Sequence, residues 1–465
     1  MAEVLFHGAV EEVTGSLHLV RMDDHWLALD CGLFQGRRSE SEEKNREWPV
    51  PPAEISAVLL SHAHIDHSGR LPRLVRDGFE GPIFCTPATR DLCAIMLPDS
   101  AHIQEEDVAY VNKKRRRKGL PAVEPLYENR DALEAIGLMQ TVSYNRWFQV
   151  LPGVLGRFQD AGHILGSAGI RLEFAARNGH TPSLFFSGDL GRPNKPIIRD
   201  PASLPPCDTI LCESTYGNRL NESAEDAREE LVRIVEETYQ RGGKVIIPAF
   251  SVGRTQTIAY HLQEEIVAGR IPRHPVYIDS PLAVNATEVF LTHPECFDAE
   301  ARELERLAGG LLDASCCTFI RNVEESKKLH GRKGPCTIIS ASGMCEAGRI
   351  RHHIKNNVQD PDSTIIIAGY QAAHTLGRRL ADGVREINLF HEPYQVKARV
   401  VQIHGFSAHA DRNDLLRLLE PLKDDSRRVC LVHGEQEQRR ALAEELRGLG
   451  FGRVQIPEKG TRIEL

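Results

Sequence analysis

The sequence of 465 residues has none of the segments that carry a protein into or across a membrane. No stretch approaches the roughly 18 apolar residues of a spanning helix, and the start at Met1–Val4 has no basic segment followed by an apolar one. The 11 cysteines are an odd number without a Cys-x-x-Cys pair, which is typical of thiols in a reducing compartment. We therefore expect a cytoplasmic protein with no membrane partner.

The chain also lacks an excess of positive charge. Its 57 basic residues against 65 acidic ones give a net charge of −8, which excludes a globally basic nucleic-acid coat protein but leaves room for a local basic groove. The one run of like charge is Lys113–Lys118, which can be interpreted as part of an RNA path or as a solvated helix face. Neither a Gly-rich Walker loop nor a Gly-x-Gly-x-x-Gly turn is present, so no nucleotide cofactor is expected.

The pattern of elements changes along the chain. Short strands separated by turns are predicted in the first 30 residues, and from about residue 208 strands and helices alternate regularly. Such alternation is typical of a mostly parallel sheet. Helices are predicted at 71–76, 222–240, 255–267, 413–419 and 436–446.

The most informative segment is His-Ala-His-Ile-Asp-His at residues 62–67, directly after an apolar strand predicted at 55–60. Two histidines two positions apart on an extended loop point the same way and can bind one metal ion, while Asp66 and His67 are offset enough to bind a second. Imidazole and carboxylate together suit zinc or a similar divalent ion. The alternative is a solvated polar turn, but such a turn has no need of four ligands in six residues.

Further candidate ligands stand at the ends of other predicted strands. His163 stands among small residues at 160–166, Asp189 follows the strand at 183–186, and His433 follows the strand at 429–432, just before Gly434. Each is weak evidence by itself, because a histidine at a strand end is more often capped or solvent-facing. Each catalytic zinc needs about three or four protein ligands and an open position, so together with the cluster these residues complete a dinuclear site. We expect the missing side chain of Gly434 to leave room near the metal ions.

The order of these residues along the chain resembles the metallo-β-lactamase superfamily: Asp30, the cluster at 62–67, His163 and Asp189. The rest of the chain resembles the β-CASP branch of that superfamily, the nucleic-acid-processing nucleases. Glu213 matches motif A of this branch, His409 matches motif B and His433 matches motif C. Further matches at 248–254, 279–283 and 340–344 extend the resemblance over essentially the whole chain.

The resemblance implies an α/β fold, in which an αββα metallo-β-lactamase sandwich carries an inserted β-CASP domain with a mostly parallel sheet. The implied boundaries place the first part of the sandwich at 1–208, the insertion at 209–394 and the second part at 395–465.

The resemblance also implies a role for each site residue. His62, His64 and His163 bind one zinc ion, Asp66, His67 and His433 bind the other, and Asp189 bridges them. Asp30 orients a ligand histidine. Asp66 is also counted as catalytic, together with the pair Glu213 and His409, in which the histidine protonates the leaving sugar oxygen.

The implied reaction is hydrolysis of phosphodiester bonds in single-stranded RNA, during RNA processing or decay, by a chain with two zinc ions. Endonuclease and 5′-3′ exonuclease action both stay open, and a homodimer is a further expectation. Phosphate contacts are expected from residues near a predicted helix start and in two turns: Ser340, Ser342, Thr375, Arg378 and Ser407. An ordinary helix start with surface arginines is the alternative. His374 departs from the family, many of whose members have glycine there.

Three other functions are weighed against this one. A small-molecule hydrolase of the same superfamily is disfavoured by the inserted domain and by the Glu213 and His409 pair. A β-CASP DNA nuclease typically lacks the motif C histidine that is present here as His433. A non-catalytic RNA-binding scaffold would have lost ligands, and all of them are present here.

Overall fold

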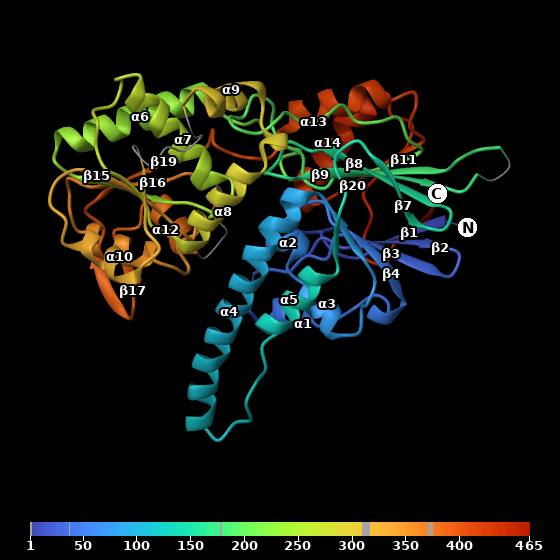
Figure 1. Ribbon diagram of the computed structural model, residues 1–465, viewed down its shortest axis with the longest axis horizontal. Helices are drawn as coiled ribbons and strands as arrows, with labels where there is room; N and C mark the ends of the chain where they lie inside the picture. Colours follow the sequence, from blue (N-terminus) through green and yellow to red (C-terminus); the bar gives the residue numbers. More distant parts are fainter. Residues whose placement is uncertain (1, 37, 177–178, 309–316, 370, 372–374) are drawn as a thin grey trace. The chain divides into compact units, whose positions relative to one another are not determined.

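A computed structural model describes residues 2–36, 38–176, 179–308, 317–369, 371 and 375–465. The chain folds into two compact units (Figure 1). Unit 1 comprises Met1–Pro193, Asp200–Leu220 and His409–Leu465, and unit 2 comprises Asn194–Arg199 and Asn221–Ala408. No helix in the described part of the chain is long and apolar enough to span a bilayer.

Unit 1 contains two seven-stranded sheets. In the first sheet, the C-terminal strand and the first three strands of the chain are antiparallel to their neighbours. The next three strands are added in parallel. Its order is β22 (Arg462–Glu464), β1 (Ala2–Phe6), β2 (His18–Met22), β3 (His25–Leu29), β4 (Ile55–Leu59), β5 (Ile83–Cys85) and β6 (Met139–Thr141).

The second sheet joins a parallel half to an antiparallel meander. Its order is β21 (Val454–Gln455), β20 (Arg428–Val432), β11 (Thr209–Glu213), β10 (Ser183–Phe186), β9 (Ala168–Phe174), β8 (Val154–Asp160) and β7 (Trp147–Leu151). Neighbouring strands β10, β11 and β20 run the same way, so the residues that follow them emerge at one edge of the sheet.

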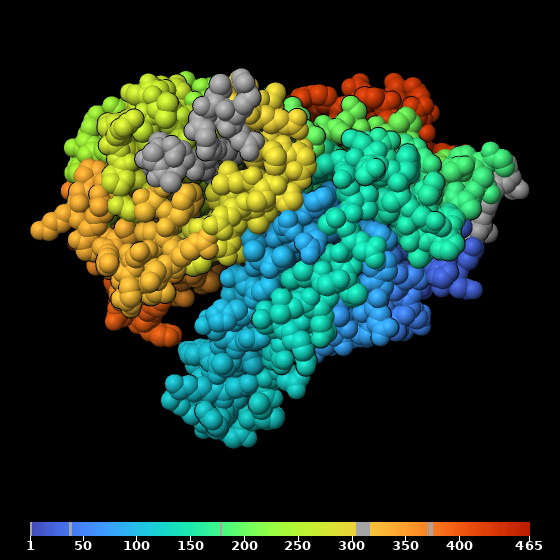
Figure 2. Space-filling model, in the orientation of Figure 1, coloured from blue at the N-terminus to red at the C-terminus, as the bar shows by residue number. Residues whose placement is uncertain are grey.

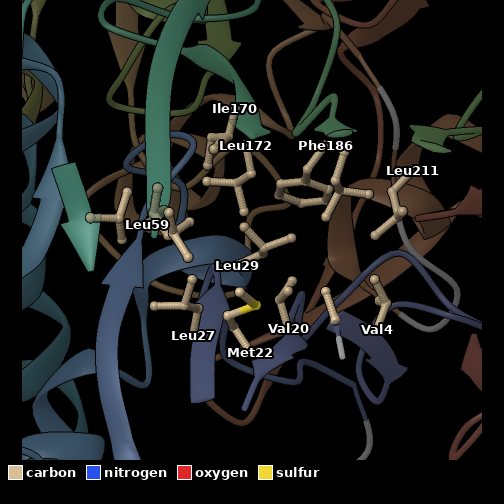
Figure 3. Close-up of a cluster of buried hydrophobic side chains, with 14 of the residues drawn as sticks. Val4, Val20, Met22, Leu27, Leu29, Leu59, Ile170, Leu172, Phe186 and Leu211 are labelled. Atoms are coloured by element: carbon tan, nitrogen blue, oxygen red, sulfur yellow. The ribbon is translucent and has the colours of Figure 1, made fainter. Parts of the chain in front are cut away.

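The main core of unit 1 lies between the two sheets. Val20 and Leu29 from the first sheet pack in one buried cluster with Ile170, Phe186 and Leu211 from the second (Figure 3). Alternate residues of each strand enter this layer, as the period of two in a β-strand requires. Each large aliphatic or aromatic side chain removed from water in this way contributes about 1.5–3 kcal/mol to folding.

Helices cover the outer faces of the two sheets, which completes a four-layer αββα sandwich (Figure 1). Leu415 of α13 (Arg412–Leu419) and Leu442 of α14 (Gln436–Gly448) pack on the outer face of the second sheet, beside Ile210 and Leu431. The helices on the side of the first sheet are α1 (Arg38–Lys44), α2 (Ile65–Ser68), α3 (Leu71–Arg76), α4 (Pro87–Arg117) and α5 (Asn129–Gly137).

Unit 2 is built on a six-stranded sheet in which every pair of neighbours is parallel. Its order is β14 (Cys317–Phe319), β13 (Val276–Ile278), β15 (Cys336–Ser340), β12 (Lys244–Pro248), β16 (Thr364–Ile367) and β19 (Arg399–Gln402). The apolar runs of these strands, such as Val245–Ile247, are buried. That burial is typical of parallel sheets, because helices cover both of their faces.

The helices of unit 2 alternate with its strands. Those at its start are α6 (Ala224–Gln240), α7 (Arg254–Val267), α8 (Pro281–Thr292) and α9 (Ala299–Ala308). After them come α10 (Val323–His330), α11 (Ile350–Asn357) and α12 (Leu376–Ala381), followed by a hairpin of β17 (Glu386–Leu389) and β18 (Glu392–Gln395). The α/β class and the mostly parallel second sheet predicted from the sequence are thus confirmed.

The units divide at other positions than the boundaries expected at 208/209 and 394/395. β11 was assigned to the insertion, but it pairs with β10 and β20 in the second sheet of unit 1. β19 was assigned to the returning part of the sandwich, but it pairs with β16 in unit 2. The strand–helix alternation begins at β11, which is the last strand of unit 1 before the chain enters unit 2. The alternation does not indicate which sheet a strand joins.

The longest helix, α4, was not predicted. Its buried residues repeat with helical spacing from Ala88 to Ala101, and beyond them it continues with exposed and half-buried residues to Arg117. Pro98 lies inside the helix, where a proline removes one hydrogen bond and normally signals an end. The helix continues past it as far as the basic run at 113–118.

Candidate metal centre

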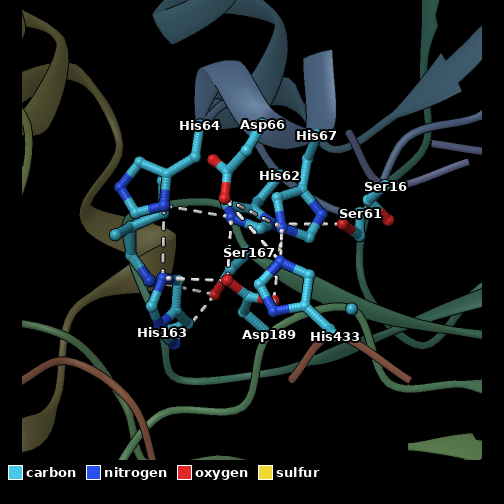
Figure 4. A network of polar contacts seen from close by, with 12 residues as sticks. Ser16, Ser61, His62, His64, Asp66, His67, His163, Ser167, Asp189 and His433 are labelled. Atoms are coloured by element: carbon cyan, nitrogen blue, oxygen red, sulfur yellow. Dashed lines mark hydrogen bonds and ion pairs between the residues drawn. The ribbon is translucent and has the colours of Figure 1, made fainter. Parts of the chain in front are cut away.

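The histidine cluster at 62–67 spans the loop after β4 and the short helix α2. Its backbone is held from both sides, since the amide of Ser16 donates to the carbonyl of Asp66 at 2.8 Å and the amide of Cys31 donates to that of His67 at 2.8 Å. The hydroxyl of Ser68 donates to the carbonyl of Ala63 at 2.9 Å. These contacts fix the direction of the cluster's side chains, which converge on one region (Figure 4).

A first group of donor atoms gathers His62, His64, His163 and Asp189, with all atoms within 4.8 Å of one another. His64 Nδ1 lies 3.1 Å from His62 Nε2 and 3.2 Å from His163 Nε2. Oδ2 of Asp189 lies 3.7 Å from His62 Nε2 and 3.6 Å from His163 Nε2. Ligands of a tetrahedral zinc at about 2.0–2.1 Å are themselves about 3.3 Å apart, so these donors have the spacing of one coordination shell.

A second group gathers Asp66, His67 and His433. The Nε2 atoms of the two histidines are 3.0 Å apart. Asp66 Oδ2 lies 3.8 Å from His67 Nε2 and 3.7 Å from His433 Nε2. The structure therefore brings together all seven residues that the sequence suggested as metal ligands, in the two sets expected from the resemblance.

Asp189 faces both groups. While its Oδ2 belongs to the first, its Oδ1 lies 3.3 Å from His67 Nε2 and 3.5 Å from His433 Nδ1. Gly188 allows this position, because it has φ +54° and a Cβ there would lie 2.7 Å from the Cβ of Ser61. Only a residue without a side chain fits between β10 and the histidine loop.

His163 sits in the turn between β8 and β9. Its backbone amide donates to the hydroxyl of Ser167 at 2.9 Å, and that hydroxyl also accepts from Ile164 at 3.2 Å. The carbonyl of Gly166 accepts from Thr86 at 2.7 Å and from Thr89 at 2.9 Å, both at the start of α4. The turn that carries His163 is thereby fixed to the N-terminus of the longest helix.

Asp30 follows β3 with φ +61° and is fully buried. Its Oδ2 lies 2.7 Å from Nδ1 of His67 and accepts from the hydroxyl of Ser61 at 3.0 Å, while its Oδ1 accepts from the Ser61 amide at 2.7 Å. A carboxylate at Nδ1 fixes the proton there and leaves Nε2 of His67 with the lone pair that a metal needs. This geometry matches the orienting role suggested for Asp30.

Burial sets the protonation of the first group. Burial lowers the pKa of His62 and His163 well below 6.5 and that of His64 to about 4. Nearby histidines add to the effect, while Asp189, and for His64 first of all Asp66, oppose it. These imidazoles are neutral at physiological pH, which is the form that binds metal ions.

The second group is dominated by its carboxylates. Burial disfavours a charged His67, but Asp189, Asp30 and Asp66 outweigh it and raise the pKa of this imidazole. Burial likewise raises the pKa of Asp66 and Asp189, and the adjacent histidines outweigh it and lower both. Together with Glu213, four carboxylates converge here, and within the described residues none of them pairs with a lysine or arginine. Buried negative charge of this kind needs cations, so the donor set fits bound metal.

Glu213 and His409 form a pair beside the first group. Glu213 ends β11 and is fully buried; its Oε1 accepts from the amide of Leu190 at 2.5 Å and lies 3.4 Å from His409 Nδ1. The His409 ring is 4.5 Å from that of His163, between centroids. Burial lowers the pKa of His409, but the Glu213 carboxylate, followed by Asp189, outweighs burial and raises it to about 9.

His433 follows β20 with φ +50°, and its amide donates to the carbonyl of Ala9 at 2.6 Å. Gly434 serves a different purpose from the one expected. A Cβ at this position would lie 2.5 Å from the hydroxyl oxygen of Ser214. The glycine therefore allows the chain to pack closely against the segment after β11, and it does not open space near the metal donors.

Sequence reasoning missed several hydroxyl residues of this region. Ser61 contacts both Asp30 and Nδ1 of His62, the latter at 3.0 Å, and the Thr215 hydroxyl lies 3.2 Å from Nδ1 of His433. Each of them stands within two positions of a residue that was singled out. That adjacency was the available signal, but serines and threonines at turns are too common to be distinguished by it.

The five residues expected to contact phosphate all belong to unit 2. Thr375 caps α12, and so begins a helix as predicted, while Arg378 pairs with Asp382 at 2.9 Å. Ser340 is buried and its hydroxyl donates to the carbonyl of Asp279 at 2.7 Å. The other two are Ser342, in the turn after β15, and Ser407, which is also buried. His374 lies outside the described residues.

Three family models match successive parts of the chain. The metallo-β-lactamase superfamily matches residues 11–87, the β-CASP domain matches 255–380, and the Zn-dependent metallo-hydrolase RNA specificity domain matches 393–457. Ribonuclease TTHA0252 of Thermus thermophilus is 34% identical over 440 residues, which are 94% of this chain and 94% of that protein. The chain belongs to the β-CASP branch of the metallo-β-lactamase superfamily.

Archaeal members of this branch are also similar. The transcription termination factor FttA of Methanocaldococcus jannaschii is 30% identical over 98% of this chain and 70% of its own length. FttA of Methanosarcina mazei is 32% identical over 92% of this chain and 66% of its own length. Among solved structures, a protein of unknown function from Enterococcus faecalis V583 aligns over 100% of both chains with a TM-score of 0.56 and 15% identity, a likeness of fold alone.

Proposed function

We propose that this β-CASP family hydrolase is a zinc-dependent ribonuclease that cleaves phosphodiester bonds of single-stranded RNA in RNA processing or decay. The observation that carries the proposal is the convergence of two donor groups on Asp189, with the pair of Glu213 and His409 beside them. The match to an RNA specificity domain over residues 393–457, which include His409 and His433, favours RNA as the substrate.

Two zinc ions per chain fit the donors. His62, His64 and His163 would hold one, Asp66, His67 and His433 the other, and Asp189 would contact both. Zinc, when bound, would act as a Lewis acid toward phosphate oxygens and lower the pKa of water, so that hydroxide is available as the nucleophile at neutral pH. Asp30 holds the Nδ1 proton of His67, so that Nε2 faces inward.

His409 is the candidate proton donor. With Nδ1 turned toward Glu213, we assign Nε2 as the atom that gives a proton to the leaving sugar oxygen. The Glu213 carboxylate raises the pKa of His409 to about 9 against the effect of burial, which favours the protonated imidazole that a proton donor requires. Glu213 in turn is fixed by the amides of Leu190 and Thr215, so its contribution is to hold the ring and its charge in place.

Contacts with the RNA backbone are assigned to unit 2. Arg378 is exposed and Ser342 is half-buried, and both carry groups suited to phosphate oxygens. Thr375, Ser340 and Ser407 complete this set, although the Ser340 hydroxyl already donates to a backbone carbonyl. We assign Ser340 the role of shaping its turn rather than of touching RNA directly.

Incubation of the purified protein with 5′-labelled and internally labelled RNA, and with DNA of the same sequence, tests the proposal. We expect cleavage of RNA that stops in chelator, resumes on addition of zinc, and exceeds cleavage of DNA. The two labels separate internal cuts from stepwise removal of 5′ nucleotides. Equal or faster cleavage of DNA, or activity that persists in chelator, would refute it.

A further inference from the structure

The far half of α4 and the segment after it form a projecting hairpin, which we call the basic arm and define as residues 101–126. A hydrogen bond fastens its base, where the hydroxyls of Ser100 and Tyr127 are 2.8 Å apart and Tyr127 is fully buried. Figures 1 and 2 show the arm extending beyond the rest of unit 1, with its tip at the lower edge of both views.

The tip of the arm carries six consecutive positive charges, from Lys113 to Lys118. All of these side chains are exposed except Arg115, which is half-buried. The whole chain has a net charge of −8, so the other residues sum to −14 once these six are set aside. The tip is thus a local positive patch on an acidic protein, and its electrostatic potential attracts a negatively charged partner outside the chain.

Acidic partners do not neutralise the tip. Within the described residues, none of the six side chains forms an ion pair, and Arg115 donates instead to the carbonyl of Pro121 at 2.6 Å. Two of the acidic groups on the arm pair with residues other than these six: Glu124 with Arg76 at 3.2 Å, and Glu106 with His102 of the same helix at 3.4 Å. A segment that served only solubility would gain from mixed charges, whereas residues 113–118 keep a single sign.

The arm is ordered by contacts that leave its charges outward. Asn112 exchanges two hydrogen bonds with the backbone of Val123, both at 2.9 Å, which fastens the helix to the returning segment. Tyr110 is 52% exposed and lies beside the tip, with the Lys114 ammonium 4.2 Å from its ring centroid. Lysines and arginines next to an exposed aromatic ring are the groups that bind single-stranded nucleic acid through phosphates and stacked bases.

The same helix connects the tip to the metal centre. Thr86 and Thr89 at its start donate to Gly166 in the turn that carries His163. From Thr89 to Arg116 the helix advances 27 residues, which at about 1.5 Å each is about 40 Å. A strand of RNA that keeps the stacked spacing of about 3.4 Å per nucleotide needs about 12 nucleotides to cover that distance, and an unstacked strand needs fewer.

We propose that the basic arm binds the backbone of the same RNA that is cleaved at the metal centre, about 12 nucleotides from the cut. The inference rests on the proposed function, because it takes the bound polyanion to be the substrate. Its recognition is independent of sequence, since lysine and arginine contact phosphates and not base edges. A short RNA contacts only the metal centre, whereas a long RNA contacts both the metal centre and the basic arm.

The test compares two triple variants that remove equal charge. The arm variant carries Lys113→Gln, Arg116→Gln and Lys118→Gln, and the control carries Arg130→Gln, Arg146→Gln and Lys459→Gln at exposed sites elsewhere in unit 1. Glutamine is nearly as good a helix former as lysine or arginine, so α4 persists, which circular dichroism and melting curves confirm. Cleavage is measured on unstructured RNA of 6 and of 30 nucleotides.

On the 30-nucleotide RNA we expect kcat/KM of the arm variant to fall at least about tenfold, mainly through KM. The slope of its binding against salt should fall by about 2, since each phosphate that a lysine or arginine neutralises on a single strand adds about 0.7. On the 6-nucleotide RNA both variants should match the wild type. An arm variant that matches the control on both lengths would overturn the proposal. So would normal cleavage combined with weaker binding to vesicles of anionic phospholipid, which would assign the arm to membranes instead.

Failure of the proposed function gives a different result. If the wild type cleaves neither RNA, ribonuclease activity is refuted, and binding of the 30-nucleotide RNA by fluorescence anisotropy then decides the role of the arm. Weaker binding by the arm variant than by the control supports the arm as an RNA-binding element, and equal binding overturns it.

Discussion

Replacing Asp30 by asparagine tests whether a residue outside both donor groups controls the zinc affinity of the second group, Asp66, His67 and His433. The two side chains have nearly the same shape, and Oδ1 of the asparagine can still accept from the Ser61 amide, which is 2.7 Å away in the wild type. What changes is the atom opposite His67. An amide nitrogen there presents hydrogen toward the Nδ1 proton, so either the ring rotates or its proton moves to Nε2, the atom needed for metal binding.

The size of the effect follows from one hydrogen bond. His67 Nδ1 donates to the Asp30 carboxylate at 2.7 Å in a fully buried position, and a hydrogen bond to a charged group contributes about 1.5–3 kcal/mol. Removing that contribution from the metal-bound state corresponds to about 10- to 150-fold in affinity, at about 1.4 kcal/mol per factor of ten. Removing a partner that orients a ligand histidine costs about 10- to 100-fold in metal affinity, which is the same range.

Competition of the protein with a chromophoric zinc chelator measures both sites in one titration. We expect the wild type to bind two zinc ions tightly. Asp30→Asn should retain one tight site and bind the second zinc ion about 10- to 150-fold more weakly. The matched control is Asp131→Asn, which alters another buried aspartate of unit 1, one that caps α5. Two unchanged zinc affinities in Asp30→Asn, or an equal reduction in the control, would refute the reasoning.

Three further substitutions test other parts of the site. Glu213→Gln should lower RNA turnover by about 10²- to 10⁴-fold while both zinc ions stay bound, because the role assigned to Glu213 is to support a general acid; turnover at the wild-type rate would contradict it. His433→Ala should lower zinc content and RNA cleavage together, measured by elemental analysis and gel assay, and unchanged zinc would remove His433 from the ligands. Gly188→Ala should push Asp189 from between the donor groups, since the added Cβ meets that of Ser61 at 2.7 Å. Its zinc content and melting temperature should fall further than those of Gly119→Ala, which has a similar φ of +66° but open space around it.

Local pattern was enough to predict many elements and the donor residues. The helix predicted at 71–76 is α3, and those at 255–267 and 413–419 differ from α7 and α13 by one residue at the start. The candidate donors could be found because Asp189 and His433 follow apolar strands, four others lie in the dense cluster at 62–67, and His163 stands among small residues after β8. In an α/β fold such positions collect at sheet edges, where ligands bind.

The partners of those donors were harder to predict, because they are selected by three-dimensional proximity. Ser16 lies 14 positions before Asp30 and Thr215 lies 218 positions before His433, yet each hydroxyl contacts that residue at 3.2 Å. No periodicity relates such pairs. The same holds for Gly188, whose need for a missing side chain comes from Ser61, in the loop that follows β4 of the other sheet.

The strand order of unit 1 explains how a large insertion leaves the site whole. β11 ends at Glu213 and β20 ends just before His433, and the two strands are parallel neighbours in register from Thr209 opposite Arg428 to Glu213 opposite Val432. Between them the chain builds nearly all of unit 2 and then returns to the next position in the same sheet. Hydrogen bonds between β11 and β20 fix the ends of these two strands relative to each other. Glu213 and His433 therefore keep defined positions although more than two hundred residues separate them in the sequence. The distances among Asp189, Glu213 and His433 therefore depend on the sheet of unit 1, and substitutions within the strands of unit 2 should leave zinc binding intact.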